Sequence, residues 1–209
     1  MKDVGQNHLI YESNDKELSP IIDEARVKMV NYYLNEYGML LLNENKLFPS
    51  VEGIGGDWNT IMYLIEQREA FLCKVFKNRT TYLSKEFYFY LKNYRNKENM
   101  NEVEERIFNF LSESQGFESN IIKDSLMLGS KEFKEAMDSL SKKMYITVLG
   151  RGKTINAQWS TYIWGTNEQW EVNANYNAKI DEKQDIVNKI TSILSKNMND
   201  KQIKSFLHL

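Results

Sequence analysis

Residues 102–164 constrain the fold more than any other part of the chain, because helical patterns run there directly into two β-rich runs. The clearest pattern has apolar residues at steps of three and four, which is the spacing of one buried helix face: Phe133, Ala136, Met137, Leu140 and Met144. YITVL and TINAQWSTYIW follow, separated by a GRGK turn predicted at residues 150–153. The segment therefore predicts a helix followed by a β-hairpin.

Two further helices are predicted ahead of this one. The first begins near Glu102, ends by Gly116, and shares one apolar face among Val103, Ile107, Phe108 and Leu111. The second is SNIIKDSLML with Ser119 as its cap, and Gly129-Ser130 ends it and caps the next helix. Three helices followed by a hairpin predict a winged helix-turn-helix, whose third helix can enter a DNA groove while the hairpin forms the wing.

The first half of the chain gives a weaker version of the same pattern. Ser19-Pro20 predicts a helix start, and a stripe follows toward Gly38: Ile22, Ala25, Met29, Tyr32 and Tyr33. MLLLNENKLFPSVEGIGG then indicates an apolar end and a loop. A second helix is expected from Asp57, with the stripe Trp58, Ile61, Met62, Ile65 and Leu72.

A short hairpin is predicted around Lys77-Asn78-Arg79, and Ser84 is expected to cap a helix through KEFYFYLKNYR. The order helix, helix, hairpin suggests a degenerate second copy of the winged helix, although no sequence repeat accompanies it. The C-terminal part carries one helix with Ile186, Ile190, Ile193 and Leu194, and a short one capped by Asn199 with Ile203 and Phe206.

The predicted fold class is therefore mainly α with short β-hairpins (α+β): a winged helix-turn-helix, either single or tandem, with C-terminal helices. We divide the chain into a polar tail (residues 1–18), a helical or degenerate winged-helix domain with a basic-aromatic segment (19–97), a winged helix-turn-helix (98–172) and C-terminal helices (173–209). The boundary between the two domains is placed at NKENMN.

Composition excludes several classes of site. A single cysteine, Cys73, allows neither a disulfide framework nor a zinc site of paired cysteines, and we expect it to be buried. His8 and His208 lie near the chain ends, where a general base is not expected. We predict no metal, no cofactor and no catalytic residue. The chain has no apolar run of membrane-spanning length and no signal-peptide pattern at its start, so we expect a cytoplasmic protein without a membrane partner.

The string GRGKT at residues 150–154 resembles a phosphate-binding loop only superficially. The required first glycine is replaced by Thr147, and the residues after Thr154 alternate like a strand instead of opening a helix. A turn between two strands is the better interpretation.

Local charge carries the argument for nucleic acid, because the net charge of the whole chain is only -2. Residues 74–97 hold seven basic residues and one acidic residue, and Lys74, Lys77 and Arg79 are the candidate DNA contacts there. Aromatic residues interleave with these cations and could stack on bases, but we favour burial in the core: Tyr82, Phe87, Tyr88, Phe89, Tyr90 and Tyr94.

The predicted winged helix is less basic. Residues 101–172 hold eight basic and eleven acidic residues, which argues against a strong sequence-specific DNA reader. The candidate contacts on its third helix and wing are Lys131, Lys134, Lys142, Lys143, Arg151 and Lys153. Glu135 and Asp138 are expected on the outer face of the same helix.

EAFLCKVFKNRTTYLSKEFYFYLK, GSKEFKEAMDSLSKKMYITVLG and WSTYIWGTNEQW together resemble the AlkZ/YcaQ-like group of bacterial winged-helix proteins, particularly its short AlkZ-related members. The resemblance covers about residues 58–170. It implies tandem winged helices and, in full-length members, DNA glycosylases that position water with a Gln-x-Gln or Gln-x-Asp motif. That motif is missing here. The nearest string is Gln67-Arg68-Glu69, and on a regular helix residues two apart point away from one another, with Glu69 toward the core.

Three hypotheses follow. The first is a non-enzymatic protein that holds double-stranded DNA nonspecifically or by shape. The second is an atypical DNA glycosylase that acts on alkylated bases. The third is a protein-interaction or structural module that has the fold but no groove contacts.

Overall fold

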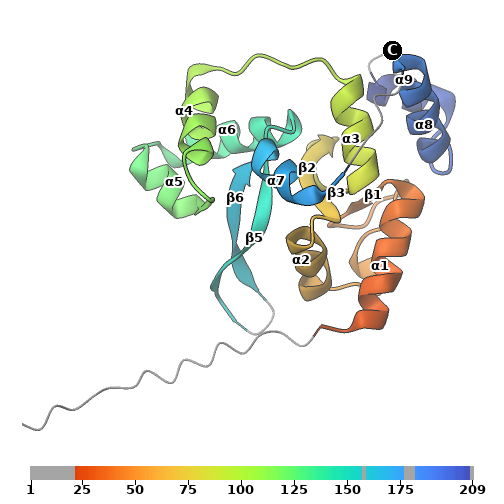
Figure 1. Ribbon diagram of the computed structural model, residues 1–209, viewed down its shortest axis with the longest axis horizontal. Helices are drawn as coiled ribbons and strands as arrows, with labels where there is room; N and C mark the ends of the chain where they lie inside the picture. The colour runs from red at the N-terminus through yellow and green to blue at the C-terminus, as the bar shows by residue number, and fades with distance from the viewer. Residues whose placement is uncertain (1–21, 157–158, 177–181, 208–209) are drawn as a thin grey trace, which may run out of the picture.

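The computed structural model describes residues 22–156, 159–176 and 182–207, and it is a mixed α+β structure with two small antiparallel sheets (Figure 1). The first part of the chain forms α1 (Glu24–Tyr37), β1 (Met39–Leu41), the 3-10 helix η1 (Glu52–Ile54), α2 (Trp58–Glu66), β2 (Ala70–Phe76) and β3 (Arg79–Ser84). The helix α3 (Lys85–Tyr94) follows directly.

The second part repeats this order of elements. It forms α4 (Glu102–Ser112), β4 (Phe117–Glu118), α5 (Ser119–Ser125), α6 (Ser130–Lys142), β5 (Ile146–Thr154) and β6 (Ser160–Thr166). The strand orders β1-β3-β2 and β4-β6-β5 also correspond, with the last strand of each part at the centre of its sheet. The helices α7 (Asn167–Ala174), α8 (Lys183–Leu194) and α9 (Asp200–Leu207) complete the described chain.

The start of the first part differs from the prediction. Asp23 is the N-cap of α1 and accepts hydrogen bonds from the backbone N–H groups of Ala25 and Arg26. Ser19 and Pro20 lie outside the described residues. The predicted buried face of α1 is also displaced by one position, because Val30 and Leu34 are buried while Tyr32 is 64% exposed. The residues after Gly38 form β1 and pair with β3, where the sequence predicted only an apolar end and a loop.

The β2–β3 hairpin is confirmed. Lys77 and Asn78 form its two-residue loop with φ of 50° and 56°, which are the left-handed angles that both residues of a type I′ turn require. Ser84 caps α3 as predicted, because its hydroxyl accepts a hydrogen bond from the Phe87 N–H.

The helix from Asp57 is confirmed, but it ends earlier than predicted. Glu66 is the last residue of α2, and Arg68 then adopts a left-handed φ of 60°. Leu72 therefore belongs to β2 instead of the helical stripe.

In the second part, α4 and α6 follow the predicted patterns. Asn101 and Glu104 cap α4 reciprocally. Ala136, Met137, Leu140 and Met144 are buried, whereas Phe133 is only half-buried. Two caps were wrong, since Glu118 and Gly129 precede α5 and α6 and neither makes a side-chain cap.

The second hairpin turns later than predicted. β5 continues through residues 150–153 with shifts in its pairing register, and Gly150 lies opposite Ile163 and Arg151 opposite Tyr162. Both glycines lie in this irregular stretch, and at Gly152 the missing Cβ leaves room for the side chains of Thr161 and Glu118. Asn156 and Trp159 flank the turn, and residues 157–158 lie outside the described residues. The hairpin extends beyond α4 and α5, and its far half lies beside α2, where the rings of Trp159 and Trp58 are in contact (Figure 1).

The two sheets meet edge to edge at a threonine. The Thr147 hydroxyl on β5 accepts from the Leu72 N–H at 3.1 Å and donates to the Leu72 carbonyl at 2.9 Å. Thr147 is fully buried.

The C-terminal helices complete the core. Ile186, Ile190 and Leu194 of α8 pack with Phe87 and Leu91 of α3 in one cluster. The amide N–H of Gln202 donates to the Asn199 side chain, which confirms that cap. No helix in the described part of the chain has the length and apolar character needed to cross a membrane.

Candidate nucleic-acid interface

The nine cations predicted to contact DNA divide into two groups. Six are exposed: Lys77, Arg79, Lys131, Lys134, Lys142 and Lys153. The other three, Lys74, Lys143 and Arg151, each form an ion pair with a carboxylate. Sequence position alone does not distinguish the groups, because each partner lies at least 39 residues away.

The three ion pairs join elements that are distant in the sequence. Lys74 Nζ on β2 lies 2.5 Å from Asp138 Oδ1 on α6, and Arg151 Nη1 on β5 lies 2.5 Å from Glu66 Oε2 on α2. Asp138 therefore faces the first sheet, although the sequence placed it on the outer face of its helix. These two cations link the first part of the chain to the second.

The third ion pair is the most buried. Lys143 Nζ lies 2.6 Å from Glu104 Oε2, and the Glu104 side chain is 2% exposed. Burial favours the neutral acid, but hydrogen bonds from Lys143, Ser139 and the Asn101 backbone prevail and lower the pKa of Glu104. This pair stabilises the packing of α4 on α6.

The basic-aromatic segment is not a continuous cationic face. Lys85 pairs with Glu69 at 2.7 Å, and Lys92 pairs with Glu171 at 2.5 Å. The aromatic residues are mainly core, as favoured from sequence, since Tyr82, Phe87 and Tyr88 are fully buried. Lys77 and Arg79 at the β2–β3 hairpin are the exposed candidate contacts of this segment.

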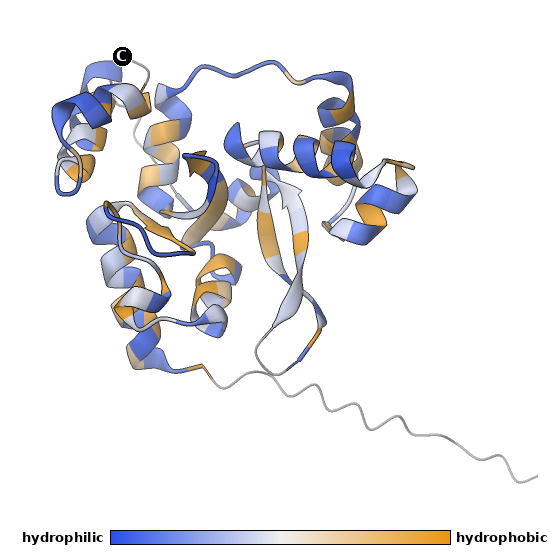
Figure 2. Cartoon of the chain, turned by 180° about the vertical axis from the view of Figure 1, so that it is seen from behind, coloured by the Kyte–Doolittle hydropathy of each residue, from blue (hydrophilic) through white to orange (hydrophobic). Residues whose placement is uncertain are grey.

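The outer face of α6 carries the exposed cations Lys131, Lys134 and Lys142. Glu135 lies four residues after Lys131, with 4.0 Å between the charged atoms, and both side chains are largely exposed. Such an ion pair contributes little to stability, so both groups remain available to a partner. Figure 2 shows α6 largely in hydrophilic colours, whereas α2 is mostly hydrophobic.

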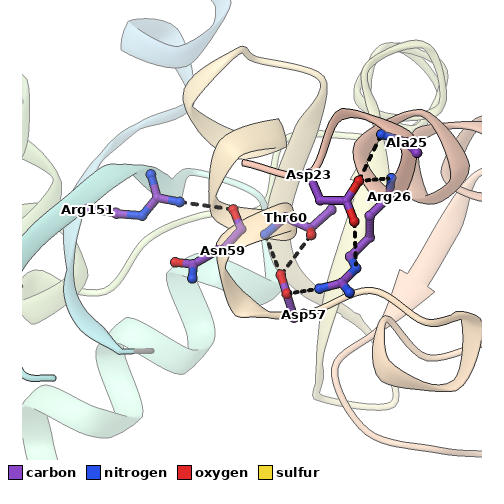
Figure 3. A network of polar contacts seen from close by, with 7 residues as sticks. All are labelled: Asp23, Ala25, Arg26, Asp57, Asn59, Thr60 and Arg151. Carbon is purple, nitrogen blue, oxygen red and sulfur yellow. Dashed lines mark hydrogen bonds and ion pairs between the residues drawn. The ribbon is translucent and has the colours of Figure 1, made fainter. Parts of the chain in front are cut away.

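A polar network holds the start of α2 (Figure 3). Asp57 Oδ1 accepts from the Thr60 N–H at 2.8 Å and from its hydroxyl at 2.7 Å, while Oδ2 pairs with Arg26. Burial raises the pKa of Asp57, but these bonds outweigh it and the net shift is downward. Arg151 adds a hydrogen bond to the Asn59 carbonyl at 2.9 Å.

A pocket that we call the indole pocket lies beside this network. It has a volume of about 460 Å³, and its lining includes Asn43, Asp57, Trp58, Asn59 and Trp159. The rings of Trp58 and Trp159 lie 4.5 Å apart between centroids. Sequence reasoning missed this pocket because the second tryptophan comes from the end of the distant β5–β6 hairpin.

Another pocket, which we call the Arg68 pocket, lies where the two parts of the chain meet. Its volume is about 560 Å³, and its lining includes Arg68, Gln115, Leu149, Ile163 and Val172. Burial lowers the pKa of Arg68, with Glu66 opposing that shift.

The string Gln67-Arg68-Glu69 does not form part of a helix. Gln67 follows the last residue of α2 and is exposed, and Glu69 pairs with Lys85. The expectation that both side chains project from one regular helix is therefore wrong, because the chain reverses at Arg68.

Other candidate chemistry is sparse in the part of the chain that the structure describes. Within residues 22–156, 159–176 and 182–207, no three His, Cys, Asp or Glu residues gather as a metal site. His8 and His208 lie outside these ranges. Cys73 is fully buried, as expected, and burial raises the pKa of its thiol to about 12.

Comparison with protein families finds a match to the family described as AlkZ related, over residues 27–208. The match extends the resemblance noted from sequence beyond residues 58–170 at both ends. Comparison with curated proteins and with solved structures finds no match.

Proposed function

The chain belongs to the AlkZ-related family, and from that premise we propose that it binds double-stranded DNA without excising bases. In this proposal, residues 98–172 act as a winged helix-turn-helix, with α6 as the groove-facing helix and β5–β6 as the wing. The observation that carries it is the order of three helices and a hairpin, in which α6 keeps an exposed face with three lysines.

Contacts to phosphates would come from the six exposed cations. Lys131, Lys134 and Lys142 lie along α6, and Lys153 lies on β5 in the wing. Lys77 and Arg79 would extend the contact to the first sheet. Lys74, Lys143 and Arg151 are engaged by carboxylates, so we assign them to stability instead of DNA contact.

DNA binding of this kind would depend more on the shape of the duplex than on its base sequence. Glu132 and Glu135 share α6 with its lysines, so few side chains on the helix can donate to base edges. Phosphate contacts position a protein on the duplex but carry no direct sequence information.

Salt dependence tests this function. Each cation that neutralises a phosphate contributes about 0.9 to the slope of log affinity against log salt. We expect Lys134→Ala, Arg79→Ala and Lys153→Ala each to lower the slope by about one, with little change in sequence preference. Lys201→Ala is the matched control, because it removes an exposed lysine on α9 outside the proposed interface. Binding that ignores salt, or no binding at low salt, would contradict the proposal and favour a protein-interaction module.

The indole pocket favours a second candidate function, an atypical DNA glycosylase. Its indole surface, amides and carboxylate are groups that could hold an unstacked base. We rank it second because the Asp57 carboxylate is engaged by Arg26 and Thr60, so it is not free to position a water molecule.

Alkylated duplex DNA decides between the two functions. We expect no release of free base above a control without protein. Release that is lost in Asp57→Asn or Trp159→Ala would establish the glycosylase at this pocket. Release that is lost in Gln67→Ala or Glu69→Ala would instead place the chemistry at the turn after α2.

A further inference from the structure

Arg68 occupies a position where glycine is usual. It follows the C-cap of α2, its N–H donates to the Ile65 carbonyl, and the Glu69 N–H donates to the Leu64 carbonyl, which is the pattern of a Schellman motif. The φ of 60° is unfavourable for a residue with a Cβ. Arginine here has a conformational cost that glycine would avoid, so its side chain requires an explanation.

Within the described residues, the Arg68 guanidinium group makes its hydrogen bonds through Nη1 alone. Nη1 donates to the Ile65, Glu66 and Leu149 carbonyls at 3.0, 3.3 and 2.6 Å. Nε is buried without a hydrogen-bond partner, and Nη2 has none among the residues that the structure describes. Nε and Nη2 form the edge that binds a carboxylate or a phosphate with two parallel hydrogen bonds.

The acidic residues beside Arg68 in the sequence do not satisfy this edge. Glu66 pairs with Arg151 through Oε2 and accepts the Arg151 N–H through Oε1. Glu69 pairs with Lys85. The residues that line the pocket include no acid, so Arg68 supplies its one formal charge.

The remaining walls indicate a ligand with an organic body. Leu149, Ile163 and Val172 give apolar surface, and Gln115 and Asn173 add amides. Val172 is 79% exposed, which leaves its apolar side chain available to a ligand. A simple inorganic anion would use the charge but not these walls.

We propose that the Arg68 pocket binds the phosphate ester of a nucleotide, with the Nε–Nη2 edge on the phosphate and the sugar or base against Val172 and Ile163. The site stands apart from the proposed duplex interface on α6. The phosphate ester could come from a free mononucleotide or from a DNA strand.

Calorimetric titration with deoxyadenosine 5′-monophosphate tests the free source, with deoxyadenosine as the ligand that lacks phosphate. We expect the nucleotide to bind and the nucleoside to bind at least tenfold more weakly. Arg68→Gly keeps the left-handed backbone and removes the guanidinium group, so nucleotide binding should be lost.

Two exposed variants keep the test valid if Arg68→Gly unfolds. Val172→Asp adds a negative charge at the rim of the pocket and should weaken nucleotide binding by about three- to tenfold, as a nearby like charge does at the protein surface. Val172→Lys, at the same position, should strengthen binding by a similar factor. Lys201→Ala, which removes an exposed lysine outside both proposed sites, should leave nucleotide binding unchanged.

A short duplex tests the strand source. If a strand phosphate occupies the pocket, duplex affinity should fall in Val172→Asp and rise in Val172→Lys. Both changes should become smaller at high salt, where surface charges are screened. Lys201→Ala is the control for the effect of a charge change elsewhere on the surface. The proposal is overturned if neither nucleotide affinity nor duplex affinity changes in Arg68→Gly and in the two Val172 variants. Loss of the Lys134 effect on duplex alone would overturn the proposed function and leave this site intact.

Discussion

α2 and α6 occupy the same place in the two repeated orders of elements, yet they have opposite surroundings. Five of the nine residues of α2 are buried, including Ile61, Leu64 and Ile65. Only four of the thirteen residues of α6 are buried, and they form one stripe. A helix covered on several sides cannot enter a groove, so this difference in burial supports the proposal that α6, and not α2, faces the DNA.

The two hairpins also differ in burial. β2 and β3 are joined by a two-residue turn and are largely buried. β5 and β6 extend farther, and Ile155 and Trp159 near their turn are 65% and 46% exposed. The first part of the chain is therefore the more buried of the two, while the second part keeps an exposed face on α6 and partly exposed residues at the end of its hairpin.

The largest loss of stability is expected from shortening a side chain on the buried helix α2. Ile61→Ala should lower the free energy of unfolding by about 2–5 kcal/mol, because the side chain is 1% exposed and its loss leaves a cavity. Phe133→Ala on α6 should cost about 1–2 kcal/mol, since that ring is only half-buried. Urea unfolding of both variants measures the difference. Equal losses would mean that the two helices are equally buried in solution.

The second comparison concerns one ion pair in each copy. Lys143→Ala should cost about 2–3 kcal/mol, because it leaves the buried Glu104 carboxylate without a charged donor. Arg26→Ala removes the partner of Asp57, but the two side chains are 40% and 43% exposed, so the cost should be below about 1 kcal/mol. A larger loss in Arg26→Ala would reverse this ranking.

The same ion pair predicts a pH dependence. The pKa of Glu104 is lowered in the folded state, so its ionised form contributes stability above its unfolded pKa of about 4.3. That contribution is lost as the pH falls through the lower, folded value. Stability measured from pH 6 downward should therefore decline less steeply in Glu104→Gln than in the wild type. Parallel curves would show that Glu104 does not take part in acid unfolding.

A smaller effect than that of Lys143→Ala is expected where the two sheets meet. Thr147→Val keeps the side-chain shape but leaves the Leu72 N–H and carbonyl without their partner, at a cost of about 1–2 kcal/mol. Thr154→Val, on the exposed end of the same strand, should change stability by less than about 0.5 kcal/mol. A neutral Thr147→Val would show that the sheets are held together by other contacts.

Prediction from sequence succeeded where a short-range signal decides the structure. The hairpin at Lys77-Asn78, the cap at Ser84 and the stripe of α6 each depend on residues within one or two turns of chain. It failed at β1, whose pairing with β3 joins residues about 40 positions apart, and at residues 150–153. Two glycines there suggested a turn, but strand pairing carries β5 through them to Thr154.

In the candidate site, too, local signals were predictable from sequence and long-range contacts were not. Lys131 and Lys134 were recognisable because a helical stripe also defines the face opposite to it. Lys74, Lys143 and Arg151 looked equivalent to them, and only the tertiary structure separates them by bringing Asp138, Glu104 and Glu66 into contact. The indole pocket and the free edge of Arg68 were also invisible, because each depends on the meeting of the two copies.

The sequence by itself determined the local elements, the order helix, helix, hairpin and the AlkZ-related resemblance, because periodicity, caps and turn residues act over a few positions. The tertiary structure alone decided which charges are free, which helix is open and where the pockets lie. Ion pairing and burial depend on which distant residues come within a few ångströms, and no spacing along the chain records that distance.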